Sequence, residues 1–82
     1  MPSTPTETEL RAAVAPLVGL APDAIDPDAN LVVLGIGSLE IMRLVSGWRR
    51  DRIPVDFEAL VAGPTLAGWL AHFAALDAAA AR

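Results

Sequence analysis

Ser38 is the residue of this chain best placed to react, because its hydroxyl follows two glycines and opens a stretch with a helical pattern. Gly35 and Gly37 leave the hydroxyl open to the active site of another protein. At the start of a helix, unpaired backbone N–H groups and the positive end of the dipole stabilise an anion by about 0.3 to 1 kcal/mol. The position therefore suits a serine that carries a phosphate, although an ordinary helix cap uses the same residue type.

Three other kinds of site are suggested by short motifs and fail on their details. The run from Gly35 begins like a dinucleotide-binding fingerprint, but Glu40 stands where the third glycine belongs. Asp26, Asp28 and Asn30 resemble the first half of a calcium-binding loop, but Leu31 occupies the position that needs glycine. Ser38 and His72 could form a nucleophile and base, but the strand and second glycine of a nucleophile elbow are missing. We predict no catalytic residue and no metal site.

The helices that must position Ser38 are predicted from apolar spacing and from capping residues. Each of the four expected helices begins at a residue whose side chain caps helix starts: Thr6, Ser38, Asp56 and Thr65. Glu9 completes a capping box with Thr6, and Pro16 should kink or shorten the last turn of the first helix. The helix that begins at Ser38 should run to about Arg50.

Residues 19–37, between the first and second helices, are predicted to be a long loop because proline and aspartate break any period. Four apolar residues should pin this loop across the helices: Ile25, Leu31, Val32 and Leu34. Long loops without regular structure are uncommon in compact domains and often functional.

The core should form where the last helix meets the first. Apolar residues at three- and four-residue spacing predict two facing stripes: Trp69, Leu70 and Phe73 against Leu10, Val14 and Leu17.

The composition indicates one small all-α domain. A chain of 82 residues, rich in Ala and Leu, with two Phe, two Trp and no Tyr, favours helices over a β-sandwich. The absence of Cys excludes a disulfide scaffold and fits a reducing cytosol. A net charge of -4 argues against binding to nucleic acid. Four cations nevertheless gather near mid-chain, where they could guide protein partners or form a solvated helix end: Arg43, Arg49, Arg50 and Arg52.

We expect residues 1–5 to be a disordered tail, residues 6–77 to be the folded domain and residues 78–82 to be a fraying extension. The N-terminal residues do not resemble a secretory signal, and no run is long and apolar enough to span a bilayer. These features predict a cytoplasmic location, and we expect the protein to be a monomer.

The run LGIGSLEIMRL, residues 34–44, resembles the phosphopantetheine attachment motif of acyl and peptidyl carrier proteins. The resemblance continues in three further segments: WRR at 48–50, IPVDF at 53–57 with Leu60, and PTL at 64–66 with Trp69. The fuller pattern, from about Asn30 to Phe73, is similar to the aryl carrier domains of nonribosomal peptide synthetases, including those that build phenolic siderophores.

This resemblance implies a small four-helix bundle of the acyl carrier protein type, with a long loop between its first two helices. It also implies a phosphoprotein in which 4'-phosphopantetheine is attached to Ser38 by a separate transferase. An acyl- or aryl-adenylating enzyme would load the arm, and a condensation domain or acyltransferase would collect the acyl group. The chain itself would not be an enzyme.

Further site residues follow from the same resemblance. The family usually has Asp before the serine, where this chain has Gly37, so we expect Gly37 to limit modification. Carriers dock through their second and third helices, which here carry four candidate contact residues: Leu39, Met42, Phe57 and Val61. Met42 and Phe57 could instead fill the core.

Two alternatives stay open at this point. The chain could carry an aminoacyl or polyketide unit, since only the loading enzyme separates such carriers from aryl carriers. It could also be a helical interaction module that carries no cofactor.

Overall fold

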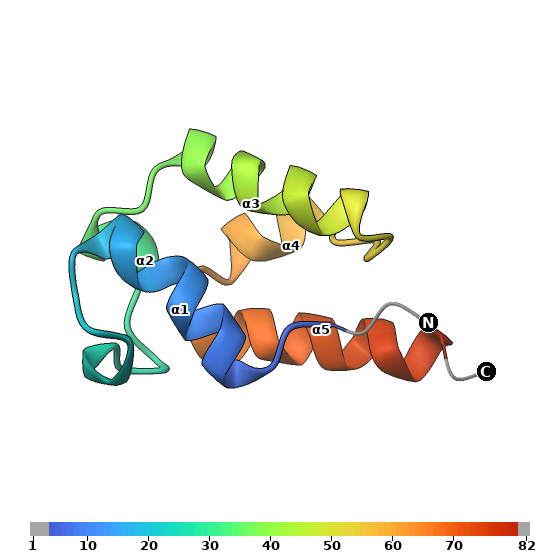
Figure 1. Cartoon of the computed structure of the whole chain (residues 1–82), viewed down its shortest axis with the longest axis horizontal. Coiled ribbons are helices and arrows are strands. Elements are labelled where there is room, and N and C mark those ends of the chain that lie inside the picture. Colours follow the sequence, from blue (N-terminus) through green and yellow to red (C-terminus); the bar gives the residue numbers. More distant parts are fainter. Residues whose placement is uncertain (1–3, 81–82) are drawn as a thin grey trace.

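A computed structural model describes residues 4–80, which form five α-helices, one 3-10 turn and no strand (Figure 1). The elements in chain order are α1 (Glu7–Val18), η1 (Pro22–Ala24), α2 (Leu31–Leu34), α3 (Ser38–Arg50), α4 (Phe57–Ala62) and α5 (Leu66–Ala80). In Figure 1, α3 and α5 extend along the molecule with α4 between them. The predicted all-α fold is confirmed, and α1, α3, α4 and α5 are the helices expected from the sequence.

Three of the predicted helix caps form as expected. The Thr6 hydroxyl accepts the Glu9 N–H at 3.1 Å, and the Glu9 carboxylate accepts the Thr6 N–H at 2.9 Å, which completes the capping box. The Asp56 carboxylate accepts the Glu58 N–H at 3.1 Å at the start of α4. The Thr65 hydroxyl accepts an N–H from the first turn of α5 at 2.9 Å.

The fourth predicted cap is wrong, because Ser38 is the first helical residue of α3 and Gly37 is its N-cap. Gly37 is extended, with φ of -93° and ψ of 162°. Its N–H donates to Glu40 Oε1 at 2.8 Å, which is the half of a capping box that a side chain at the third helical residue supplies; within residues 4–80, no side chain accepts the N–H groups of the first turn of α3. The Ser38 side chain is therefore not needed to cap the helix.

Residues 19–37 are more regular than predicted, because they contain η1 and α2. Asn30 accounts for α2: its side-chain oxygen accepts the N–H groups of Val32 and Val33 at 2.9 and 3.2 Å. Asparagine is among the strongest N-cap residues, so a single turn of helix forms here despite its short length.

Buried side chains pin this connection, with one correction to the prediction. Ile25 and Leu31 are buried and Leu34 is half-buried, as expected. Val32 is 50% exposed, because α2 turns it away from the core. The Leu31 N–H also donates to the Pro64 carbonyl at 2.7 Å, which joins the connection to the turn before α5.

Further hydrogen bonds hold the earlier part of the connection. Arg11 of α1 donates through Nη1 to the carbonyls of Pro22 and Ile25, at 2.7 and 2.8 Å. The Ala67 N–H donates to the Pro27 carbonyl at 3.0 Å. The segment that leads to Ser38 is thus attached to both α1 and α5.

The core is apolar, and no polar or charged side chain within residues 4–80 is buried. Leu10, Val14, Trp69 and Phe73 are buried as predicted, whereas Leu17 and Leu70 are only partly buried at its edge. The Trp69 indole N–H donates to the Leu60 carbonyl at 2.9 Å. The Trp48 ring packs edge-on against Trp69 and Phe73, with centroid distances of 6.4 and 5.0 Å.

The two ends of the described chain meet at α5. The Thr4 hydroxyl donates to Asp77 Oδ2 at 2.6 Å. Residues 78–80 of the expected C-terminal extension continue α5. Residues 1–3 and 81–82, where we predicted a tail and fraying, lie outside the described residues.

We expect Trp69→Ala to lower the free energy of unfolding by about 3 to 5 kcal/mol, because it empties the centre of the core and unpairs the Leu60 carbonyl. Thermal unfolding followed by circular dichroism measures this loss. Trp69→Phe keeps a ring but no N–H donor, so it should melt between the two proteins. A melting temperature unchanged in Trp69→Ala would contradict this account of the core.

Candidate functional site

Ser38 lies exposed at the surface, directly after the turn that joins α2 to α3. Gly35 ends α2 with φ of 119°, a left-handed conformation that residues with side chains rarely adopt. Ile36 follows and is buried, with 2% of its surface exposed. The buried isoleucine anchors the turn, and the chain then leads Ser38 back to the solvent.

The Ser38 hydroxyl is available for chemistry. Within residues 4–80, no hydrogen bond engages this hydroxyl, and the first three N–H groups of α3 have no acceptor. An exposed hydroxyl beside unpaired donors at a helix start fits a covalently attached phosphate group, because the donors and the helix dipole favour an anion.

Large apolar side chains are exposed on α2, α3 and α4. They are Val32 and Val33 on α2, Leu39 and Met42 on α3, and Val61 on α4. Leu39 and Met42 are 60% and 53% exposed, as expected for contact residues rather than core. Phe57 is only half-buried and packs against the core, so it is shared between the interior and the surface.

Val32 and Val33 were not predicted to lie at the site. The signal that could have found them is Asn30, whose capping preference predicts a helical turn there and hence a side chain directed outwards.

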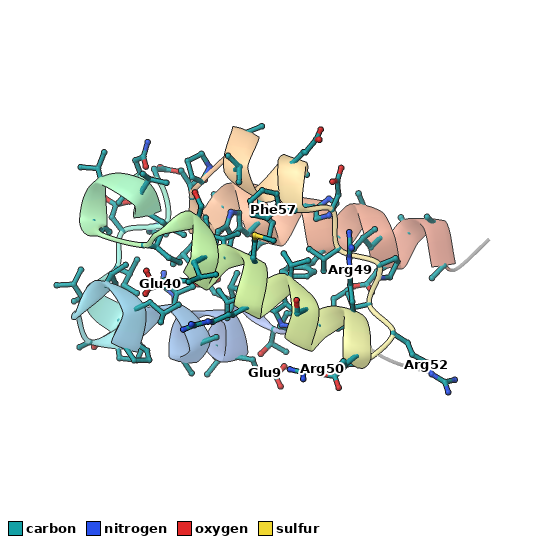
Figure 2. The ribbon with its side chains drawn as sticks, turned by 90° about the horizontal axis from the view of Figure 1, so that it is seen from above. Glu9, Glu40, Arg49, Arg50, Arg52 and Phe57 are labelled. Carbon is teal, nitrogen blue, oxygen red and sulfur yellow. The ribbon has the colours of Figure 1, made fainter. Side chains whose placement is uncertain are left out.

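The first turn of α3 carries an acidic side chain, and its last turn carries basic side chains. Figure 2 shows Glu40 near the start of the helix and Arg49, Arg50 and Arg52 at its far end. The cations of the last turn lie at the negative end of the helix dipole, where they are favourable. The first turn of α3 thus carries the Glu40 carboxylate, Arg43 lies one turn further on, and the remaining arginines lie at the far end of the helix.

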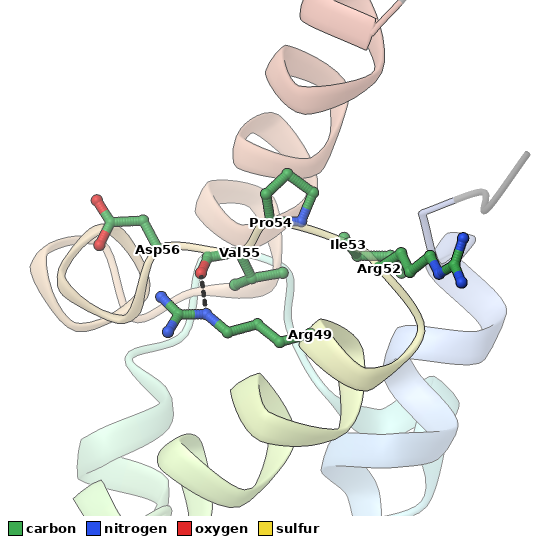
Figure 3. A pocket seen from close by; sticks show the side chains of 6 residues that line it. All are labelled: Arg49, Arg52, Ile53, Pro54, Val55 and Asp56. Carbon is green, nitrogen blue, oxygen red and sulfur yellow. Dashed lines mark hydrogen bonds between the residues drawn. The ribbon is translucent and has the colours of Figure 1, made fainter.

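A hollow of about 410 Å³ lies at this basic end and is lined by Arg49, Arg52 and residues 53–56 (Figure 3). Arg49 Nε donates to the Val55 carbonyl at 3.0 Å across it. This bond fastens the end of α3 to the segment that leads into α4. The hollow lies at the opposite end of α3 from Ser38 and is not part of the serine site.

His72 is engaged in the fold. Its Nε2 accepts the backbone N–H of Asp56 at 3.1 Å, at the start of α4. Among the described residues, no three His, Cys, Asp or Glu side chains are grouped so that they could hold a metal ion. In the same part of the chain, no helix is both long and apolar enough to cross a membrane.

Residues 8–73 match the family model described as "Phosphopantetheine attachment site". The chain belongs to this family. The resemblance to phosphopantetheine-dependent carriers read from residues 34–44 is therefore confirmed, and membership implies a covalently attached 4'-phosphopantetheine.

Several curated proteins are similar to this chain. Phenyloxazoline synthase MbtB of Mycobacterium tuberculosis is 50% identical over 60 residues, which cover 73% of this chain and 4% of that protein. Pseudomonine synthase PmsE of Pseudomonas entomophila is 40% identical over 58 residues, or 71% of this chain and 10% of that protein. Enterobactin synthase component B of Escherichia coli is 31% identical over 68 residues, which cover 83% of this chain and 24% of that protein. The chain thus corresponds to a small part of each relative. No solved structure matches it.

We expect Arg49→Ala to lower the free energy of unfolding by about 1 kcal/mol, because it removes the hydrogen bond to the Val55 carbonyl. Urea denaturation measures the change. Arg50→Ala is the matched control: it removes an exposed arginine of the same turn that makes no hydrogen bond within residues 4–80. Equal stability of the two variants would show that the Arg49 bond contributes nothing.

Proposed function

We propose that this chain is a non-catalytic carrier that holds an activated acyl group as a thioester on a phosphopantetheine arm attached to Ser38. The observation that supports this proposal best is the exposed, uncommitted Ser38 hydroxyl on the first turn of α3. Ser38 also lies inside the run that resembles the attachment motif and inside the family match.

The proposed attachment is a phosphoryl transfer to the serine. Ser38 Oγ forms a bond to the phosphorus of coenzyme A that bears the pantetheine group. The anhydride bond between this phosphorus and the adenosine 5'-phosphate breaks, and adenosine 3',5'-bisphosphate leaves. The serine proton passes to a base of the transferase. The chain contributes an exposed nucleophile and, at the start of α3, backbone donors that face the resulting phosphodiester. When bound, the group supplies the thiol on which an acyl group is held.

The names of the relatives support a role in nonribosomal peptide biosynthesis of the siderophore type, with an aryl or related acyl group as cargo. The partners would be a phosphopantetheinyl transferase, an acyl- or aryl-adenylating enzyme, and a condensation domain or acyltransferase. We place this work in the cytoplasm, where coenzyme A is available. An aminoacyl or polyketide cargo would need the same site and a different loading enzyme.

We expect coenzyme A and a broad-specificity transferase to add one phosphopantetheine to the wild-type protein, as measured by intact mass. Ser38→Ala should abolish the mass increase. Ser46→Ala is the matched control, because Ser46 is also an exposed serine of α3. A modified Ser38→Ala protein, or an unmodified Ser38 in protein isolated from its native host, would refute the assignment.

A docking surface beside the arm forms the second part of the proposal. Leu39 and Met42 of α3 and Val61 of α4 are exposed, and Phe57 supports them from the edge of the core. A carrier visits several enzymes in turn, so its interfaces should be small, with a few anchors supplying most of the binding energy. Met42 suits this use because its flexible thioether adapts to different pockets.

We expect Met42→Ala and Val61→Asp to slow acyl transfer from the arm to a condensation partner while leaving the melting temperature nearly unchanged, because both side chains face solvent. Leu20→Ala serves as the control, since Leu20 is an exposed apolar residue outside these helices. Transfer at the wild-type rate in both variants, or a large loss of stability, would rule out the docking surface.

A further inference from the structure

Arg52 occupies a backbone position that favours glycine. It follows the end of α3, where the Arg52 N–H donates to the Arg49 carbonyl and the Ile53 N–H donates to the Trp48 carbonyl, both at 3.0 Å. In this pattern of helix ending the residue after the cap is left-handed, and Arg52 has a φ of 66°. Among residues 4–80 it is the one residue other than glycine with a positive φ. The turn itself therefore does not explain why an arginine stands here.

Arg49 and Arg52 line the hollow at the end of α3 without a carboxylate partner. Both side chains are exposed, and no ion pair within residues 4–80 includes either of them. The bond from Arg49 Nε to the Val55 carbonyl fixes the Arg49 side chain and leaves its two Nη groups without an acceptor in the same residues. Asp56 also lines the hollow, but its carboxylate accepts the Glu58 N–H and caps α4. The hollow thus presents two cations that no ion pair of the described chain neutralises.

An apolar segment separates the two guanidinium groups. It consists of Ile53 and Val55, which are buried, and Pro54, which is exposed. In Figure 3 the guanidinium groups of Arg49 and Arg52 point away from each other on the two sides of this segment. A single small anion could therefore contact only one of them. An extended peptide could contact both and pack an apolar side chain against Pro54.

We propose that this hollow binds an acidic, extended segment of a partner protein. Two carboxylates of the segment would pair with Arg49 and Arg52, and an apolar side chain between them would lie against Pro54. A guanidinium group binds a carboxylate through two parallel hydrogen bonds, which gives geometric specificity as well as attraction. The net charge of -4 disfavours long polyanions such as nucleic acids, so a short acidic motif fits this surface better.

The proposed peptide site is remote from Ser38. The 13 residues of α3 separate the two by about 20 Å along the helix. A partner bound at the hollow would leave Ser38 uncovered, so one protein could hold the domain while another acts on the serine. The site does not depend on modification of Ser38, and its failure is distinguishable from failure of the proposed function.

A nuclear magnetic resonance titration of the isotope-labelled chain tests the proposal. The probe is the synthetic peptide acetyl-EALAE-amide, and acetyl-QALAQ-amide is the matched uncharged peptide. We expect the charged peptide to shift the amide signals of residues 49–56 and to leave those of residues 38–42 unchanged. The uncharged peptide should bind about tenfold more weakly, and added salt should weaken binding of the charged peptide.

Two arginine variants separate binding from folding. Arg52→Gly removes a guanidinium group and relieves the left-handed backbone, so it should weaken peptide binding about tenfold while raising the melting temperature. Arg50→Ala is the matched control, because Arg50 is an exposed arginine of the same turn that does not line the hollow. It should bind the charged peptide nearly as wild type does.

Each contrary result overturns a defined claim. No shift with the charged peptide refutes the site, and equal binding of the two peptides refutes the role of charge. Inorganic phosphate that binds at the same amides as tightly as the charged peptide would make the hollow a simple anion site. Equal losses in Arg50→Ala and Arg52→Gly would leave only general electrostatic attraction. If Arg52→Gly lost binding and also melted lower, Arg52 would be a structural residue. Modification of Ser38, followed by intact mass, should proceed in every variant.

Discussion

The hydrogen bond between the Trp69 indole N–H and the Leu60 carbonyl is the directional contact on which the arrangement of helices depends. Apolar burial drives the domain to collapse but does not choose an orientation. The other buried side chains of residues 4–80 carry no polar group, so this is the buried bond that orients α4 against α5, and the bond from the Asp56 N–H to His72 Nε2 adds a second, exposed link between them. The edge-on packing of Trp48 on Trp69 and Phe73 then sets how α3 is rotated, and hence which of its residues face solvent.

The connection between α1 and α3 illustrates a second constraint. A long segment without partners would leave its backbone unpaired and would cost conformational entropy to hold in place. Here Arg11, Leu31 and Ala67 each provide hydrogen bonds that attach the segment to the rest of the fold. These bonds fix the position of Ser38. The turn through the buried Ile36 places Ser38 at the surface in a defined direction, although the Ser38 side chain is exposed.

Much of this structure could be predicted from the sequence, because the helices follow apolar spacing and strong caps such as Thr6 and Asp56. The exact start of α3 could not, since serine and glycine are both acceptable N-caps and the choice depends on the reach of the Glu40 side chain. The helix α2 was missed because one turn is too short to show a period, and only Asn30 marks it. The chemistry proposed for Ser38 could not be predicted from physical reasoning alone, because a modified serine and an ordinary one look alike at a helix start, and the proposal depends on the family pattern.

The contact between Thr4 and Asp77 has a consequence for how such a domain is tethered. It holds the incoming chain against the last helix at the end of the molecule opposite Ser38, as the course of α3 and α5 in Figure 1 makes clear. In a longer polypeptide, segments joined before Thr4 and after Ala80 would therefore meet the domain at that same end. Ser38 would then lie far from the point of attachment, so that rotation of the domain about such linkers would move the proposed attachment serine farther than residues near Thr4.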